Sequence, residues 1–410
     1  MEVLYPVCCG LDVHKASVTA CLRSPGDGPQ RRQEVQTFGT STRELRRLVA
    51  WLTAASCTHV AMESTGVYWR PVYNLLEDRF ELLLVNAQHV KMVPGRKTDV
   101  RDSEWLAQLL ELGPLRGSFL PPAAQRELRD VVRYRKRLIE ERAREANRVL
   151  KVLETANIKL GSVVTAVLGV SARAMLKALI AGAGPPAELA ELAQRSLRRK
   201  RPALAEALTG RVTAHHRFLL AQLLRHIEFL DEAIATCDGR IATCTAAEAD
   251  AVARLDTIPG VARRTAETIV AELGCDMSRF PTAGHAASWA GLCPGNHESA
   301  GKRLSGRTRF ANRVLRQALV ESARGAVCKR DCYLAAQYRR LVKRRGDKKA
   351  IVAVAHSILV IAYHVLRDGV SYRELGGDYF DHLHAQRLTR YHTQRLAALG
   401  YTVTLTKSAA

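Results

Sequence analysis

Aromatic residues are scarce in this 410-residue chain, at 6% of the sequence. This scarcity excludes extended platforms on which nucleic-acid bases stack as a major feature. The ten cysteines include no Cys-x-x-Cys pair. Their spacing therefore argues against a zinc ribbon and against a disulfide framework, and favours reduced thiols in a cytosolic protein.

Signals for export and for membrane insertion are also lacking. The first ten residues, MEVLYPVCCG, have neither the basic start nor the apolar run of a signal peptide. The longest apolar stretch, residues 351–366, is interrupted by His356 and His364 and is shorter than the ~20 residues that span a bilayer. We predict a buried helix there and expect no membrane association.

Positive charge is what the sequence has in excess. Lys and Arg number 62 against 40 Asp and Glu, a formal net charge of +22. Residues 299–349 alone hold 16 Lys or Arg against three acidic residues. A charge this concentrated indicates a polyanionic partner and favours nucleic acid over a merely solvated face.

The first part of the chain alternates strand and helix patterns. Strands are predicted over residues 7–13, 16–23, 34–38, 59–62 and 81–86, with helices opening at the Ser41–Glu44 capping box and over 68–78. Three strands, helix, strand, helix, strand, helix is the order of an RNase H-like (RuvC-like) α/β fold. We assign residues 1–125 to this domain.

The remainder of the chain is predicted to be all-α. Residues 126–250 form a helical region with a long charged helix over 126–153, for which a coiled coil and a packed bundle both remain open. Residues 251–345 form a third domain, and 346–410 a helical C-terminal extension. Within 255–274, a Pro259–Gly260 turn between helices resembles a helix-hairpin-helix, in which Gly260 would lie against a phosphate.

Four acidic residues carry the predicted chemistry. Asp12 and Glu63 each end a predicted strand, and Asp99 and Asp102 lie three apart at a predicted helix start. Clustered carboxylates repel one another unless a cation offsets them, and hard oxygen ligands suit Mg²⁺ or Mn²⁺. Two such ions can polarise a phosphodiester. The sequence therefore predicts a magnesium (or manganese) site on an enzyme that cuts nucleic acid.

Ser299 is the candidate nucleophile in the basic region. It lies in a predicted turn between helices, among cations that can stabilise a pentacoordinate phosphorane. Ser305 is the local alternative. The side chains expected to contact nucleic acid here are Lys302, Arg303, Arg307, Arg309 and Arg313.

Three segments of the first part resemble the three blocks of the DEDD insertion-sequence transposases, a group that includes the Piv and MooV DNA invertases. The segments are GLDVHKASVTACL, MESTGVYWRPVYNLLE and KTDVRDSEWLAQLL. In the second half, IPGVARRTAETIVAELG and the segment from FPTAGHAASWAG to VLRQALVESA are similar to the transposase domain of the same family. Residues 348–380 resemble the tail of longer members.

The resemblance implies a role for each matched residue. Asp12, Glu63, Asp99 and Asp102 would be the metal-binding catalytic tetrad, and Ser299 the serine that joins covalently to DNA. The family usually has two glycines after this serine, whereas this chain has Ala300 and Gly301. Ala300 allows the same close backbone approach if its φ is negative. Ala311 likewise replaces a frequent glycine before Asn312.

Partners also follow from the resemblance. The tetrad of one protomer would complete the site around the serine of another, which requires a dimer and a tetrameric synapse on donor and target double-stranded DNA. A structured noncoding guide (bridge) RNA from the element would pair with both DNAs. The basic runs 133–137, with Arg135, Lys136 and Arg137, and 195–201 suit an RNA backbone. A prokaryotic cytoplasmic protein associated with the nucleoid is expected.

Two other functions remain open from the sequence. A metal-only RuvC-like, structure-selective endonuclease would leave free ends with no protein attached, and Ser299 would be structural. A nucleic-acid-binding protein with a decayed catalytic domain would have no metal-dependent activity, although the four acids are intact.

Overall fold

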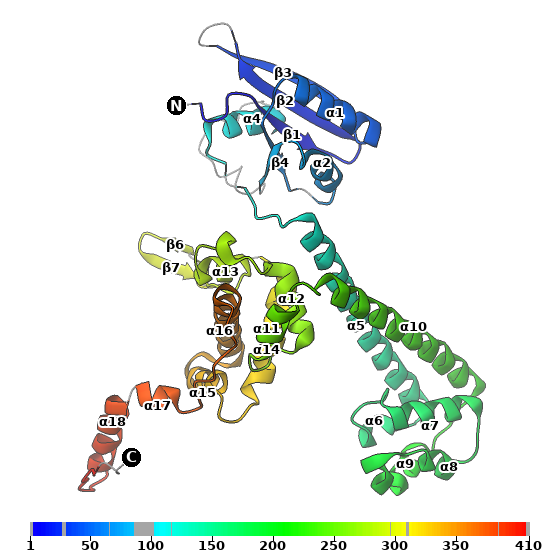
Figure 1. Cartoon of the computed structure of the whole chain (residues 1–410). Helices are drawn as coiled ribbons and strands as arrows, with labels where there is room; N and C mark the ends of the chain where they lie inside the picture. The colour runs from blue at the N-terminus through cyan, green and yellow to red at the C-terminus, as the bar shows by residue number, and fades with distance from the viewer. Residues whose placement is uncertain are drawn as a thin grey trace. The chain divides into compact units, whose positions relative to one another are not determined.

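The computed structural model describes residues 3–26, 30–64, 66–85, 102–115, 117–295, 297–308, 311–383 and 385–406. The chain divides into two compact units, Met1–Pro121 and Pro122–Ala410 (Figure 1). The predicted boundary after residue 125 falls in the first turn of the helix that opens the second unit. The predicted divisions at 250 and 345 remain predictions.

A five-stranded mixed sheet forms the centre of the first unit, in the order β3-β2-β1-β4-β5. β1, β2 and β3 are antiparallel neighbours, and β4 and β5 run parallel to β1. The three helices of this unit that the described residues contain are α1, α2 and α4. The bounds are β1 Cys8–Val13, β2 Ser17–Pro25, β3 Arg31–Gly39, α1 Thr42–Ala54, β4 His59–Glu63, α2 Trp69–Leu76, β5 Glu81–Val85 and α4 Asp102–Leu112.

Helices cover both faces of this sheet because its central strands are apolar on both sides. Alternate residues of β1 point to opposite faces, so Leu11 packs with α1 and α2 whereas Cys8 packs with α4. Ser41 caps α1 by accepting a hydrogen bond from the amide of Glu44. The predicted α/β first domain is confirmed in this architecture.

Two long helices form the framework of the second unit, α5 (Ala123–Thr155) and α10 (Ala214–Cys244), which pack along one another (Figure 1). The short helices that join their far ends surround an apolar cluster containing Met175, Leu176 and Leu220. The sequence left a coiled coil and a packed bundle open for residues 126–250. Within one chain, the structure has a pair of long helices with a packed bundle of short helices at one end, which we call the tip. The tip contains α6 Leu160–Val163, α7 Val170–Ala181, α8 Pro186–Glu191, the 3₁₀ helix η1 Arg195–Lys200 and α9 Arg201–Ala207.

The rest of the second unit packs around α16 (Asp347–Asp368). This helix alone, among the described residues, is long and apolar enough to cross a membrane, yet 56% of its most apolar window is buried inside the protein. The predicted buried helix is therefore confirmed. Its surroundings are α11 Ala249–Asp256, α12 Arg263–Leu273, η2 Met277–Arg279, α13 Ala283–Trp289, β6 His297–Ser299, β7 Lys302–Ser305, α14 Arg313–Val327 and α15 Tyr333–Arg345, followed by α17 Tyr379–Leu383 and α18 Ala385–Ala398.

Candidate active site

Three of the four predicted acids lie at one edge of the first unit. Leu11 of β1 is opposite Met62 of β4, and these strands are parallel. Asp12 and Glu63, one residue further along each strand, therefore follow at the same edge and on the face that α4 covers. Asp102 is the first residue of α4. We call Asp12, Glu63 and Asp102 the acidic edge.

A glycine brings α4 against β1 beside this edge. A Cβ atom at Gly10 would collide with the carbonyl oxygen of Ser103 and the amide nitrogen of Ala107. Ser103, next to Asp102, is completely buried, and within the described chain its hydroxyl has no hydrogen-bond partner. Only glycine at position 10 allows the helix start to lie this close to the strand that carries Asp12.

The acidic edge is partly exposed to solvent. The side chain of Asp12 is 29% exposed, and its Oδ2 atom lies 3.1 Å from Nε2 of the exposed His14. His14 is thus a local hydrogen-bonding partner of Asp12, which is one of the proposed metal ligands. Among the residues described, no three His, Cys, Asp or Glu side chains are gathered closely enough to hold a metal ion. Asp99 lies outside the described residues.

Ser299 lies at the end of a two-stranded hairpin rather than in a plain turn between helices. It pairs with Lys302 across a two-residue turn of Ala300 and Gly301. Both turn residues have positive φ, 47° and 74°, as a type I′ turn requires. The condition of a negative φ at Ala300 is not met, because this tight turn places both central residues in the left-handed region. Ser299 and both turn residues are exposed.

The competing serine is held differently. Ser305 ends β7, and its hydroxyl accepts a hydrogen bond of 3.2 Å from the amide of Arg307. Among the predicted contact residues, Lys302, Arg307 and Arg313 are exposed. Arg303 lies on β7, with a side chain outside the description, and Arg309 lies outside the described residues altogether.

The structure gives a packing reason for glycine at position 260. It adopts a φ of 83° in the turn between α11 and α12, and a Cβ atom there would collide with the backbone of α14 at Ser322 and Ala326. The glycine thus allows α12 and α14 to pack closely. Its predicted contact with a phosphate remains a prediction.

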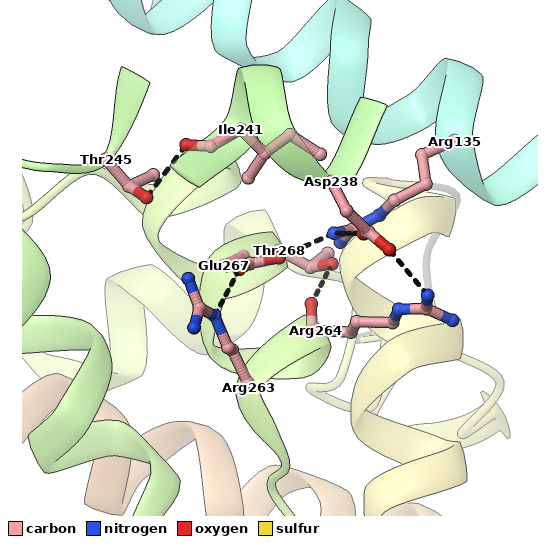
Figure 2. A network of polar contacts seen from close by, with 8 residues as sticks. All are labelled: Arg135, Asp238, Ile241, Thr245, Arg263, Arg264, Glu267 and Thr268. Atoms are coloured by element: carbon pink, nitrogen blue, oxygen red, sulfur yellow. Dashed lines mark hydrogen bonds and ion pairs between the residues drawn. The ribbon is translucent and has the colours of Figure 1, made fainter. Parts of the chain in front are cut away.

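The basic run 133–137 is not the exposed patch that its sequence suggested. Arg135 is 3% exposed, and its guanidinium donates to Glu267 at 2.6 Å and to Asp238 at 2.7 Å. Figure 2 shows how Arg263 and Arg264 complete this network between α5, α10 and α12. Arg135 is therefore corrected from a nucleic-acid contact to a buried interhelix ion pair.

The two residues after Arg135 differ in their surroundings. Lys136 is partly buried, which lowers its pKa, although the nearby Glu321, Glu140 and Glu272 carboxylates oppose the shift. Arg137 is exposed. Their contacts with nucleic acid remain predictions.

A second buried carboxylate, Glu272 of α12, was not singled out in the sequence. It is fully buried and forms a bidentate pair with Arg133 of α5, at 2.7 and 2.8 Å. Its Oε2 atom also accepts a hydrogen bond of 2.7 Å from Asn312, whose Oδ1 caps α14. The available signal was an acidic residue within the apolar helix 266–273. Glu272 thus fixes the start of α14, shortly after the serine hairpin, to α5.

Burial of the neighbouring Arg129 lowers its pKa to about 10, against the attraction of Glu272. The same guanidinium donates to the carbonyl oxygen of Ala271 at 2.9 Å and lies 5.5 Å from the ring centre of Trp289. These contacts give α5 a further attachment to α12 and α13.

Comparisons with known proteins find two family matches along the chain. Residues 9–158 match the family model DEDD_Tnp_IS110, described as "Transposase", and residues 252–339 match "Transposase IS116/IS110/IS902 family". The first match contains Asp12, Glu63 and Asp102, and the second contains Ser299.

Two relatives carry related names. A Sinorhizobium fredii protein named "Putative transposase y4pF/y4sB" is 27% identical over 81% of this chain and 79% of its own length. A Streptomyces coelicolor protein, "Insertion element IS110 uncharacterized 43.6 kDa protein", is 32% identical over 29% of each chain. The two family matches, over residues 9–158 and 252–339, and the first relative, which aligns with 81% of this chain, identify this protein as an IS110-family transposase, an enzyme that acts on DNA.

Proposed function

We propose that this transposase cuts and rejoins DNA through a covalent phosphoserine intermediate at Ser299, assisted by divalent metal at Asp12, Glu63, Asp99 and Asp102. The observation that carries the proposal is Ser299 at an exposed, tightly turned hairpin, paired with a lysine and followed by the basic segment. An exposed hydroxyl with cations close in sequence suits attack on a phosphodiester.

The sheet supports an RNase H-like first domain. The order β3-β2-β1-β4-β5, with an antiparallel β1–β3 and parallel β4 and β5, is the arrangement expected of that fold. In such a sheet, acids at the ends of β1 and β4 and at the start of a covering helix lie at one edge. This supports a common task for Asp12, Glu63 and Asp102.

The donor chemistry of the acidic edge fits Mg²⁺ or Mn²⁺. The side chains offer hard carboxylate oxygens, Asp12 lies within hydrogen-bond distance of His14, and the buried Ser103 hydroxyl beside Asp102 has no hydrogen-bond partner among the described residues. A bound divalent ion would polarise the phosphate and offset its charge. The residues that would hold it are Asp12, Glu63, Asp102 and Asp99.

The chemistry balances without any oxidant or reductant. The Ser299 oxygen bonds to phosphorus as the bond from phosphorus to the leaving DNA oxygen breaks, and the hydroxyl proton passes to that leaving oxygen through solvent or a nearby base. A DNA hydroxyl then attacks the phosphorus of the phosphoserine, the bond from phosphorus to the Ser299 oxygen breaks, and the proton of the attacking hydroxyl passes to the Ser299 oxygen through solvent or a nearby base. The cations near the hairpin stabilise the negative charge of both transition states.

Partners belong to the same proposal. We place the protein in the cytoplasm of its host, where a tetrad and a serine from different protomers act on the same phosphate within a tetrameric synapse. An element-encoded guide RNA would supply the sequence choice. Sequencing the RNA that co-purifies with the protein from its host tests this part, because a defined species from the element's flanks is expected.

Formation of a covalent adduct tests the nucleophile. The full-length protein with its co-purified RNA is incubated with Mg²⁺ and supercoiled plasmid carrying the element ends, and SDS-resistant protein–DNA complexes are measured. Ser299→Ala should abolish the adduct and recombination, while the matched Ser305→Ala retains both. Asp12→Asn should lose the adduct yet still bind DNA. Normal adduct from Ser299→Ala would remove Ser299 as nucleophile.

The alternative is a metal-only RuvC-like endonuclease, which the acidic edge alone would support. It predicts metal-dependent cleavage by Ser299→Ala with free DNA ends and no attached protein. Cleavage of that kind at the wild-type rate would favour the endonuclease over the recombinase.

A further inference from the structure

A basic groove lies between α14 and α16, and we propose that it binds the sugar–phosphate backbone of a nucleic-acid strand. The groove has a volume of about 510 Å³, and four cationic residues line it. Three are on α14 and one is at the start of α16. They are Arg313, Arg316, Arg324 and Lys348.

The cations of α14 form one stripe along the helix. Residues 313, 316 and 324 are separated by three and eight positions, which at 3.6 residues per turn places them on one side of α14. The stripe extends over eleven residue-to-residue steps, from 313 to 324, or about 16 Å at 1.5 Å per step. That length corresponds to about five base-pair steps of 3.4 Å, so the stripe can follow successive phosphates of one strand.

The floor of the groove differs from its rim. Val320 on α14 and Ile351 and Val352 on α16 contribute apolar side chains to the lining. A sugar ring has an apolar face and a phosphate does not. An apolar floor between cationic rims therefore suits the alternation of sugar and phosphate better than it suits an isolated inorganic anion.

Few acidic side chains neutralise this rim. Arg324 pairs with Asp347 at 3.5 Å, but both side chains are about half exposed, and such pairs contribute little. The Asp347 carboxylate also accepts a hydrogen bond from Tyr338. Within the part of the chain that the structure describes, Arg316 and Lys348 have no ion-pair partner. A phosphate can therefore replace Asp347 against Arg324 at small cost.

Glu321 is the one carboxylate within α14. Glu321 accepts a hydrogen bond of 2.9 Å from the Gln317 amide and acts electrostatically on Lys136 of α5. It does not line the groove. The groove therefore keeps a net positive charge.

The groove continues from the serine hairpin along the chain. Pro294 and Thr308 pair at the base of the hairpin, and α14 begins at Arg313 shortly afterwards. The inference rests on the proposed function and deepens it, because it assigns a surface to a nucleic-acid strand handled by the same domain. DNA and RNA share the phosphodiester chemistry, so the experiment must distinguish them.

The test measures binding of the full-length protein without divalent metal, so that no strand is cut. The dissociation constant for a 40-bp DNA duplex and for a 40-nucleotide RNA is measured across a series of salt concentrations. Each lost phosphate contact reduces the slope of log K against log salt by about 1. Arg316→Gln/Arg324→Gln should reduce it by about 2, and weaken binding at least tenfold at about 0.1 M salt, for one or both nucleic acids.

The matched control is Arg43→Gln/Arg46→Gln, which removes the same charge from the exposed side of α1. Its slope should stay within experimental error of the wild type. Arg316→Lys/Arg324→Lys should restore most of the slope, and the single Arg316→Gln should lose about half as much as the double variant. Thermal unfolding of each variant verifies folding.

The outcome shows whether the groove binds nucleic acid and whether the bound strand is DNA or RNA. A loss confined to DNA assigns the groove to a DNA strand, and one confined to RNA assigns it to the guide. Equal slopes for the groove and control variants with both nucleic acids would overturn the proposal. Because no bond is broken, failure here leaves the Ser299 adduct experiment unaffected.

Discussion

Ala300 carries a left-handed backbone conformation in a turn next to the proposed nucleophile. An L-residue with a Cβ atom pays roughly 1–2 kcal/mol for this conformation, whereas glycine does not. The type I′ geometry supplies a reason for glycines at both turn positions in related sequences. Alanine at position 300 therefore destabilises the turn, and this turn directly follows Ser299.

We expect Ala300→Gly to strengthen the hairpin. Removing the Cβ atom relieves the turn, so amide hydrogen exchange in β6 and β7 should slow by about fivefold, equivalent to ~1 kcal/mol. The matched change is Gly301→Ala, which meets open space but adds strain at a φ of 74°, and it should accelerate exchange. Equal exchange rates in both variants would contradict a strained turn.

Individual residues also explain why Arg135 was misassigned. A run of five residues with four cations, RYRKR, looks like a surface patch in sequence. The helix turns each member by 100°, so Arg135 points inward while Tyr134 and Arg137 remain exposed. Its partners Asp238 and Glu267 are more than 100 residues away, so no local pattern indicates them.

At the scale of elements, the contact between β1 and α4 controls the acidic edge. Gly10→Ala should push α4 away from the strand, because the new Cβ atom meets backbone atoms that cannot rotate aside. We expect the free energy of unfolding of the first unit to fall by about 3 kcal/mol or more. We also expect metal-dependent activity to be lost. Chemical denaturation followed by circular dichroism measures the first effect.

The control lies in the same unit. A Cβ atom at Gly117 would meet only Leu83 at 3.8 Å, an ordinary contact. Gly117→Ala should therefore leave unfolding within about 0.5 kcal/mol of the wild type. If Gly10→Ala is equally neutral, α4 is not held against β1 as described.

Most elements could be predicted from the sequence because their patterns are local. Apolar runs and the Ser41 cap indicated the strands and the first helix of the first unit, and the long charged pattern over 126–153 indicated α5. The β6–β7 hairpin was missed, because each strand is only three or four residues long and its turn lacks a conventional Asn-Gly pair. Long-range features, such as the Glu272 contacts and the groove beside α16, depend on packing that a single sequence does not encode visibly.

At the scale of the whole molecule, the two units should respond differently to alkali. Burial raises the pKa of Cys8, Cys21 and Cys57 to about 12, and that of Cys9 well above its ordinary value. All four belong to the first unit. In the unfolded chain these thiols ionise near pH 9, so unfolding releases protons above that pH.

The sign of the effect follows from this release. The contribution of the buried thiols to stability is fully present below pH 9 and is lost as the pH rises from 9 towards 12, by about 1.4 kcal/mol for each thiol and pH unit. In the second unit, burial also raises the pKa of Cys275, to about 11, and that of Cys237, Cys293 and Cys332. Thermal melts of the full-length protein between pH 8 and 10.5 should therefore show both units losing stability, the first more steeply.

A variant separates the thiols from other titrating groups. Cys21→Ala/Cys57→Ala removes two of the four thiols and should reduce this pH dependence by about half, whatever its stability at pH 8. An unchanged slope would assign the alkaline loss to other groups in the unit.

The uninterrupted course of α5 limits how its length can change. Arg129, Arg133 and Arg135 dock one end on α12, and Val149 and Leu153 enter the apolar cluster at the other. Inserting one residue between them would rotate one anchor by 100° relative to the other and break its pairing. Within α5, length differences among relatives are therefore expected to be insertions or deletions of seven residues, with an equal change in α10. Other length differences are expected only in the short helices beyond position 155.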